Sequence, residues 1–350
     1  MVPPLKTLPS RTEMLTAAVA ASGGGALSAL HVPLAWMIGA MLATAALGWH
    51  RPVAFPGWAR PFGLVFLGLA LGATFSGEVL AAVTAALPLL AVAGTLAIAS
   101  GLLVARLFTR LAGTDPRTGY FCAVPGGVIV MAILAQEAKV PVATVTLAQT
   151  MRVLVVVLTF PPLLGWLAPH GAFGAYAAAV QPVWWPGLAA MALGGLALAL
   201  PLRAAGLANP WMLGPCGFAI LLAATGWLPS GVPVPLVDAA QVAMGANLGL
   251  RLNRSFILAS RRLAIAGLLS ALVLSVLLTA LALLLALAGG LPIAAAVLGM
   301  APGGMPEMAL TAKALDLAVP LVLGFHLTRT VLCNLLVGPI HRLGAKLQLL

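Results

Sequence analysis

The sequence predicts an all-α polytopic membrane protein, built from two inverted repeats of about five spans each plus a broken or re-entrant Pro-Gly-Gly helix per repeat. Composition is the first observation. Of 350 residues, 62% are hydrophobic and only 7% are charged, whereas soluble domains carry about a quarter charged residues. The other two observations are an internal duplication and a one-sided distribution of basic residues. No soluble core could bury so much apolar surface, so the chain lies in a bilayer.

Two Pro-Gly-Gly segments reveal the duplication. Pro125-Gly126-Gly127 recurs as Pro302-Gly303-Gly304, an offset of 177 residues (302 − 125). Further pairs keep this offset, or one of 175 near the start of each copy (211 − 36): Gln149 and His326, Arg152 and Arg329, Pro162 and Pro339, Gly68 and Gly245, Gly72 and Gly249, Trp36 and Trp211. Self-similarity at a fixed period indicates a repeat architecture. We therefore predict a first membrane repeat at 13–172 and a second at 180–346.

Each copy contains six apolar runs close to the ~20 residues that a helix needs to span a bilayer. In the first copy they fall at about 13–31, 34–50, 61–77, 80–108, 121–137 and 142–168. In the second they fall at about 183–203, 209–227, 236–252, 256–288, 293–315 and 318–341. The fourth run of each copy is longer than a straight crossing needs, which predicts a tilted or kinked helix; Pro88 lies inside the first of them.

Basic residues indicate which runs cross the membrane. If the fifth run of each copy returns or breaks inside the membrane, 14 of the 18 Lys and Arg residues lie on one side. If all runs cross, Arg203 and the arginines of 251–262 face outward, which the positive-inside bias disfavours. An odd number of crossings per copy turns the second copy upside down. The sequence thus predicts inverted repeats, a build common among secondary transporters, in a cell inner membrane with both termini cytoplasmic.

The Pro-Gly-Gly segments are the candidate substrate site. Proline removes a backbone donor and glycine holds a helix poorly, so these segments predict a break in each of two helices. A helix that restarts at membrane depth points free N–H groups and its positive dipole end inward. Two such ends predict an anion site formed around Gly126, Gly127, Gly303 and Gly304. The alternative is that the glycines only allow close helix packing.

Two arginines in the apolar middle of helices are the second signal. A charge there costs at least ~2.5 kcal/mol, so we expect Arg152 and Arg329 to bind a substrate or counter-ion. A structural role is the alternative, in which each arginine caps the freed carbonyls of a broken helix or Arg329 pairs with Glu307. Glu307, whose counterpart is Val130, is the candidate coupling residue, although its charge could equally neutralise a helix dipole.

Gln149 and His326 complete the candidate substrate-binding residues. Each lies one helical turn before an arginine and on the same face. For His326 the alternatives are a proton relay and a buried, satisfied side chain.

Several classes of function find no support in the sequence. The net charge of +11 is explained by basic cytoplasmic loops that meet anionic lipid, and no stretch is long enough for a nucleic-acid-binding domain. No metal-ligand spacing, nucleophile elbow or Walker loop is present. We therefore expect no enzyme activity, no cofactor and no metal. Cys122, Cys216 and Cys333 lie inside apolar runs and are interpreted as buried hydrophobic residues.

These motifs resemble those of the AbrB-type membrane protein family. The resemblance covers about residues 14–344 and is carried by Pro125-Gly-Gly with Arg152, Pro302-Gly-Gly with Glu307 and Arg329, and the Trp36 and Trp211 turns. It implies a duplicated transmembrane unit, distantly like the cation/proton-antiporter and bile-acid-symporter folds, in which two broken helices cross at the midplane. Members are often labelled ammonia monooxygenase or regulator. The regulator name is shared with an unrelated soluble DNA-binding protein, and no copper or iron ligand set supports the oxygenase.

We therefore expect a secondary transporter that moves a small organic anion by alternating access. Two arginines and two helix N-termini should outweigh one glutamate, which favours an anion over a cation. Coupling to a proton or a sodium ion through Glu307 stays open. A membrane regulator or sensor that binds a ligand without net transport is the alternative, and a membrane oxygenase is the third hypothesis. The expected partners are a small-molecule or ion substrate and the lipid bilayer, and the chain could form a homodimer.

Overall fold

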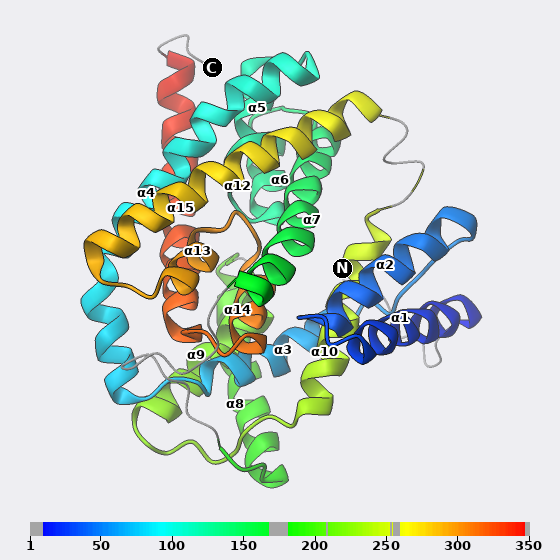
Figure 1. The fold of residues 1–350 in the computed structure, drawn as a ribbon, viewed down its shortest axis with the longest axis vertical. Coiled ribbons are helices and arrows are strands. Elements are labelled where there is room, and N and C mark those ends of the chain that lie inside the picture. Colours follow the sequence, from blue (N-terminus) through cyan, green and yellow to red (C-terminus); the bar gives the residue numbers. More distant parts are fainter. Residues whose placement is uncertain (1–9, 168–180, 208, 253, 255–259, 347–350) are drawn as a thin grey trace.

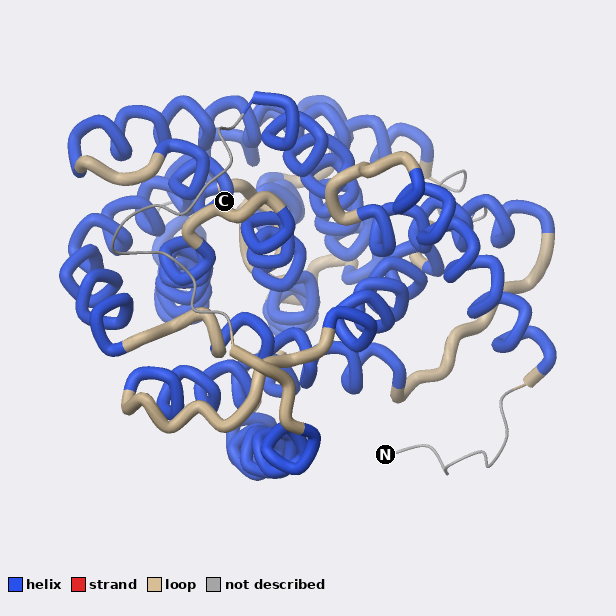
Figure 2. The backbone as a smooth tube through the Cα atoms, turned by 60° about the horizontal axis from the view of Figure 1, so that its bottom comes forward, coloured by secondary structure: helices blue, strands red, loops and turns tan. Residues whose placement is uncertain are grey.

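The computed structural model describes residues 10–167, 181–207, 209–252, 254 and 260–346. In these ranges every regular element is a helix, and short loops join the helices (Figure 2). The prediction of an all-α polytopic membrane protein is confirmed. The predicted repeat boundaries at 172 and 180 lie outside the described residues.

The helices of the first half are α1 (Arg11–Ala29), α2 (Ala35–His50), α3 (Ala59–Gly72), α4 (Gly77–Ala112), α5 (Pro116–Ala123), α6 (Val128–Glu137) and α7 (Val142–Leu167). Those of the second half are α8 (Trp185–Ala204), α9 (Pro210–Ala224), α10 (Val234–Leu250), α12 (Arg261–Gly289), α13 (Ile293–Met300), α14 (Met305–Ala314) and α15 (Val319–Lys346). Among the described helices, α4, α7, α8, α12 and most of α15 are long and apolar enough to span a bilayer, and α3 and α9 are shorter apolar helices.

The duplication seen in the sequence recurs in the helix boundaries. Helices α13 and α14 begin and end 177 residues after α5 and α6 (293 − 116, 300 − 123, 305 − 128 and 314 − 137). The over-long fourth runs are α4, a single helix of 36 residues that contains Pro88, and α12. Both end at an equivalent glycine in the left-handed conformation, Gly113 with φ 68° and Gly290 with φ 62°, where a residue without Cβ meets no steric penalty.

Two pairs of counterpart helices run in opposite directions. In Figure 1 α4 rises through the molecule while α12 descends, and α7 descends while α15 rises. A hydrogen bond joins the opposite ends of the first pair: Arg262 Nε, at the start of α12, donates to the Leu111 carbonyl at the end of α4 at 2.9 Å. The start of one copy's helix therefore lies beside the end of the other's.

Helices from both halves mix in two packing units. The first bundle comprises α1–α3 and α8–α10, and its main contacts between the two halves of the sequence join α2 to α10 and α3 to α9. The second bundle comprises α4–α7 and α12–α15, with its main contacts between α4 and α15, between α4 and α12 and between α7 and α12. In Figure 1 the first bundle occupies the lower and right-hand part of the molecule. The two halves of the sequence are thus distinct from the two units that pack in space.

Glycines set the close helix crossings of the first bundle. A Cβ on Gly245 of α10 would overlap the Met37 carbonyl of α2, and a Cβ on Gly68 of α3 would come within 2.5 Å of the Met212 carbonyl of α9. Met37 and Met212 are themselves counterparts (212 − 37 = 175). Small residues at such positions let helix backbones approach closely, so each of the two glycines allows its helix to pack closely against a helix of the other copy.

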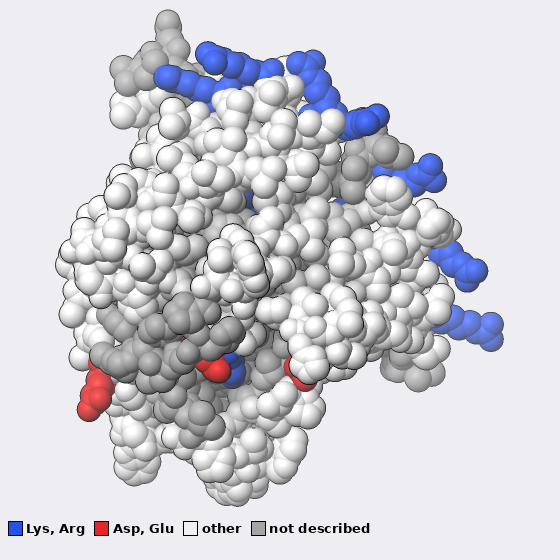
Figure 3. All heavy atoms as spheres, in the orientation of Figure 1, with Lys and Arg blue, Asp and Glu red and all other residues white. Residues whose placement is uncertain are grey.

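Charged side chains are unevenly distributed over the surface. On the face shown in Figure 3, most Lys and Arg side chains gather along the upper and right-hand edges, and Asp and Glu lie in the lower part. Figure 1 has the same orientation, and there the upper edge carries the end of α4 and the start of α12. The basic ends of counterpart helices therefore share one side of the molecule.

Candidate functional site

Each Pro-Gly-Gly segment separates two short helices inside the second bundle. Helix α5 ends at Ala123 and α6 begins at Val128, and α13 ends at Met300 and α14 begins at Met305. The N-caps of α6 and α14 are Gly127 and Gly304, both extended and neither with a side-chain cap. Glycine has no side chain, so neither N-cap residue supplies a side-chain hydrogen bond to the first N–H groups of its helix.

The two arginines hydrogen-bond to the carbonyls that the breaks set free. Arg152 donates to the Val124 carbonyl at 3.3 Å and to the Gly126 carbonyl at 2.8 Å. Arg329 donates to the equivalent carbonyls, Ala301 at 2.7 Å and Gly303 at 2.8 Å. Both side chains are buried, with 4% and 7% of their surface exposed. The geometry includes the capping role that the sequence left as an alternative.

Arg152 also has capacity for a further contact. Its Nε is buried and has no hydrogen-bond partner within the described part of the chain, whereas Arg329 has no such unpaired atom there. Arg329 Nη2 lies 2.9 Å from His326 Nδ1. The two arginines are therefore equivalent in their carbonyl contacts and different in the rest of their surroundings.

Gln149 and His326 hold the ends of the helices that precede the breaks. Gln149 Nε2 donates to the Phe121 carbonyl at 2.8 Å, and His326 Nε2 lies 3.1 Å from the equivalent Leu298 carbonyl. A guanidinium can only donate and a carbonyl can only accept. His326 must therefore accept at Nδ1 from Arg329 and donate from Nε2, which makes it the neutral Nε2–H tautomer.

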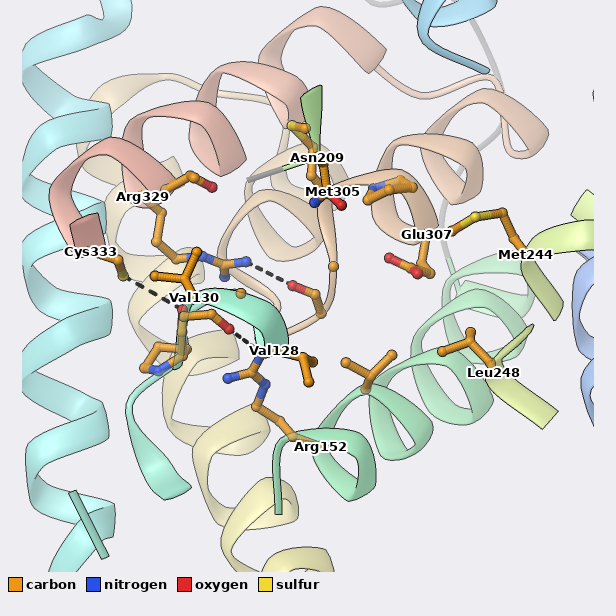
Figure 4. A pocket seen from close by; sticks show the side chains of 18 of the residues that line it. Val128, Val130, Arg152, Asn209, Met244, Leu248, Met305, Glu307, Arg329 and Cys333 are labelled. Atoms are coloured by element: carbon orange, nitrogen blue, oxygen red, sulfur yellow. Dashed lines mark hydrogen bonds between the residues drawn. The ribbon is translucent and has the colours of Figure 1, made fainter. Parts of the chain in front are cut away.

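One cavity of about 110 Å³ lies between the two bundles, where both breaks meet. A site of this size exceeds the ~10–15 Å³ that one water needs by almost an order of magnitude. The second bundle contributes both Gly-Gly pairs, Arg152, Glu307 and Arg329, and the first bundle with its adjoining loop residues contributes Arg60, Asn209, Asn247 and Arg251. Figure 4 shows Arg152 and Arg329 on one side of this space and Glu307 across from them.

Glu307 is the acidic residue among the residues lining this cavity. It is 5% exposed, and its Oε2 has no hydrogen-bond partner within the described part of the chain. A Cβ on Gly304 would overlap this oxygen. The glycine at the N-cap of α14 therefore makes room for the carboxylate.

The structure brings together most of the residues that the sequence singled out. Gly126, Gly127, Gly303, Gly304, Arg152, Arg329 and Glu307 all line the cavity. Gln149 and His326 are fully buried and do not line the cavity. They contact carbonyls of α5 and α13, the helices that precede the breaks. Their contact with a substrate remains a prediction.

Sequence reasoning missed the contribution of the first bundle. The charge pattern places Arg60 and Arg251 among the basic loop residues, and no motif includes Asn209 or Asn334, yet all four line the cavity. Arg60 Nη2 donates to Asn209 Oδ1 at 3.4 Å across 149 positions of sequence. Neither residue stands in a motif, and Arg60 has the apolar Val237 as its counterpart. No signal in a single sequence could have paired them.

Within the described residues, no group of three or more His, Cys, Asp or Glu side chains could hold a metal ion. The cysteines predicted to be buried are free and buried. Cys333 Sγ contacts the Pro125 carbonyl at 3.7 Å, which ties α15 to the break of the other copy.

The fold and the cavity define a polytopic membrane protein with an arginine-rich interior site at the junction of two helical bundles. A family model described as "Transition state regulatory protein AbrB" matches residues 9–344. The chain belongs to this AbrB family, as its motifs indicated. A curated relative, "Uncharacterized protein YhjN" of Bacillus subtilis (strain 168), is 29% identical over 357 residues, which cover 93% of this chain and 91% of the relative.

Proposed function

We propose that this protein is a secondary transporter of the cell inner membrane that moves a small organic anion by alternating access. The observation that carries the proposal is the charge of the cavity. Arg60, Arg152, Arg251 and Arg329 line it against Glu307, and two uncapped helix N-termini add positive dipole ends. An anion is the ligand that such a site would favour.

The directions of the counterpart helices support a transporter, because they fit an inverted repeat. The opposite directions of α4 and α12 and of α7 and α15 (Figure 1) are those expected if the second copy lies upside down in the bilayer. The basic edge in Figure 3 would then be cytoplasmic under the positive-inside bias. The same proposal assigns both chain termini to the cytoplasm. Transporters with this symmetry commonly bind substrate at interrupted helices near the midplane.

Alternating access would come from movement of one bundle against the other. The cavity takes Arg60 and Arg251 from the first bundle and its adjoining loop, and Arg152 and Arg329 from the second. A relative displacement would separate these two pairs and change the side from which the anion is reached. Coupling to a proton or a sodium ion through Glu307 belongs to the same proposal.

The proposal assigns no enzyme activity, no cofactor, no metal and no nucleic acid to the protein. Its partners are the lipid bilayer and a small-molecule or ion substrate, and it leaves a homodimer open. A membrane regulator or sensor is the second candidate, because a buried cavity lined by arginines suits anion binding with or without transport. Such a protein would bind the same anion at the same cavity without moving it.

Flux through purified protein in liposomes separates these candidates. We expect uptake and counterflow of a radiolabelled carboxylate from a panel of acetate, lactate and succinate. Binding of a panel member without any exchange would contradict transport and favour the sensor. Metal analysis of the same preparation tests the oxygenase hypothesis, since copper or iron bound in stoichiometric amount would support it.

A further inference from the structure

The two helix N-termini at the cavity differ in one charge. At α14, Glu307 places its carboxylate beside the N-cap Gly304. At α6, the equivalent position is Val130 (307 − 177), which lines the same cavity without a charge. One N-terminus therefore has an anion supplied by the chain, and the other does not.

The Glu307 carboxylate is buried and incompletely paired. Its Oε2 has no partner within the described part of the chain, and the residue is 5% exposed. Figure 4 shows the side chain pointing into the space between the two breaks. Burying a charged group with an unpaired oxygen is costly, and a proton on that oxygen removes the charge.

The surroundings of Glu307 suit a proton better than a sodium ion. The charged or titratable groups that face it or pack against α14 are Arg60 on α3, Arg251 after α10, Arg152 on α7, and His326, Arg329 and Cys333 on α15, while α13 carries none. A sodium ion needs several oxygen ligands, and Arg329 already occupies the Ala301 and Gly303 carbonyls. Four arginines around one cavity would also repel a cation. His326 is held neutral between Arg329 and Leu298, so it offers no competing proton site.

We propose that an anion binds at the α6 N-terminus beside Arg152 only together with one proton on Glu307 Oε2. A bound anion and an ionised Glu307 would place two negative charges in one cavity of about 110 Å³. The proton passes from the solvent to the carboxylate, the anion keeps its charge, and the pair enters without net charge. The ligand class is a small monocarboxylate. This inference rests on the proposed function, because it assumes that the cavity is the anion site.

Calorimetry of the full chain in detergent tests the inference with acetate and lactate as probes. Titrations in two buffers of different ionisation enthalpy should show uptake of about one proton per bound anion in the pH range where Glu307 is ionised without ligand. In that range the affinity should weaken about tenfold for each unit of rising pH. Glu307→Gln, which stays neutral, should bind the same anion without proton uptake and without this slope.

The outcomes separate the inference from the proposed function. Anion binding by the wild-type protein without proton uptake would overturn the inference and leave the anion site intact. Failure of both probes to bind wild-type protein and variant would overturn both. The wild-type measurement decides the inference even if Glu307→Gln fails to fold.

Discussion

Arg152 and Arg329 make the same contact in the two copies, because the Nη2 of each donates at 2.8 Å to the carbonyl of the first glycine in its Pro-Gly-Gly segment. In hydrocarbon every backbone polar group needs a partner. The arginines supply partners where proline and glycine interrupt the helix. They can therefore hold the site in shape as well as face a ligand.

Replacing either arginine by glutamine should destabilise the protein. Arg152→Gln and Arg329→Gln each leave buried carbonyls without their donor, at a cost of about 1–3 kcal/mol for each orphaned group. Thermal unfolding in detergent should show a lower midpoint for both variants. Arg110→Gln, on an exposed residue at the end of α4, is the matched control and should leave the midpoint unchanged. A variant as stable as the wild type that binds no anion would instead assign its arginine to the ligand alone.

Neutralising the arginines of the first bundle should weaken binding with little effect on folding. Arg60 and Arg251 are half-buried and line the cavity. Each of Arg60→Gln and Arg251→Gln should reduce anion affinity by about tenfold, or ~1.4 kcal/mol, while stability changes by no more than about 0.5 kcal/mol. Titration calorimetry with acetate measures the first and thermal unfolding the second. Unchanged affinity in both variants would remove the first bundle from the site.

Replacing His326 by glutamine should lower the stability of the protein only slightly. Gln149 already holds the equivalent carbonyl in the first copy, so His326→Gln keeps a donor for Leu298, whereas His326→Leu leaves that carbonyl unpaired at about 1–3 kcal/mol. Because the imidazole is held neutral by its two partners, the pH dependence of anion binding should persist in His326→Gln. Loss of that dependence in a folded variant would move the proton site from Glu307 to His326.

Substituting the glycines at helix crossings should destabilise the protein more than substituting a glycine whose surroundings are open. Gly245→Ala and Gly68→Ala push a methyl group onto a neighbouring backbone carbonyl and should cost about 1–3 kcal/mol through overpacking. Gly338→Ala is the control: nothing lies within 4 Å of its Cβ, and helix propensity should stabilise it by up to ~1 kcal/mol. Unfolding midpoints that rank the variants in the opposite order would contradict the proposed role of the glycines.

The sequence by itself determined the class of protein and the family. Both depend on local or repeated features: the length of apolar runs, and short motifs repeated at a constant offset. The same pattern located the Pro-Gly-Gly segments with Arg152, Arg329 and Glu307, all of which line one cavity. Proline and glycine act on their own backbone, so their positions can be interpreted without a fold.

Only the tertiary structure decided which residues of the two copies come together around the cavity. It placed Arg60 beside Asn209, 149 positions away, and it grouped helices of both halves into bundles that the repeat boundaries do not follow. It also showed which carbonyls Arg152 and Arg329 contact. It placed Gln149 and His326 against carbonyls of α5 and α13, outside the lining of the cavity. Such contacts arise from packing between segments that are distant in the sequence. The side-chain pattern of one segment does not specify which distant segment packs against it.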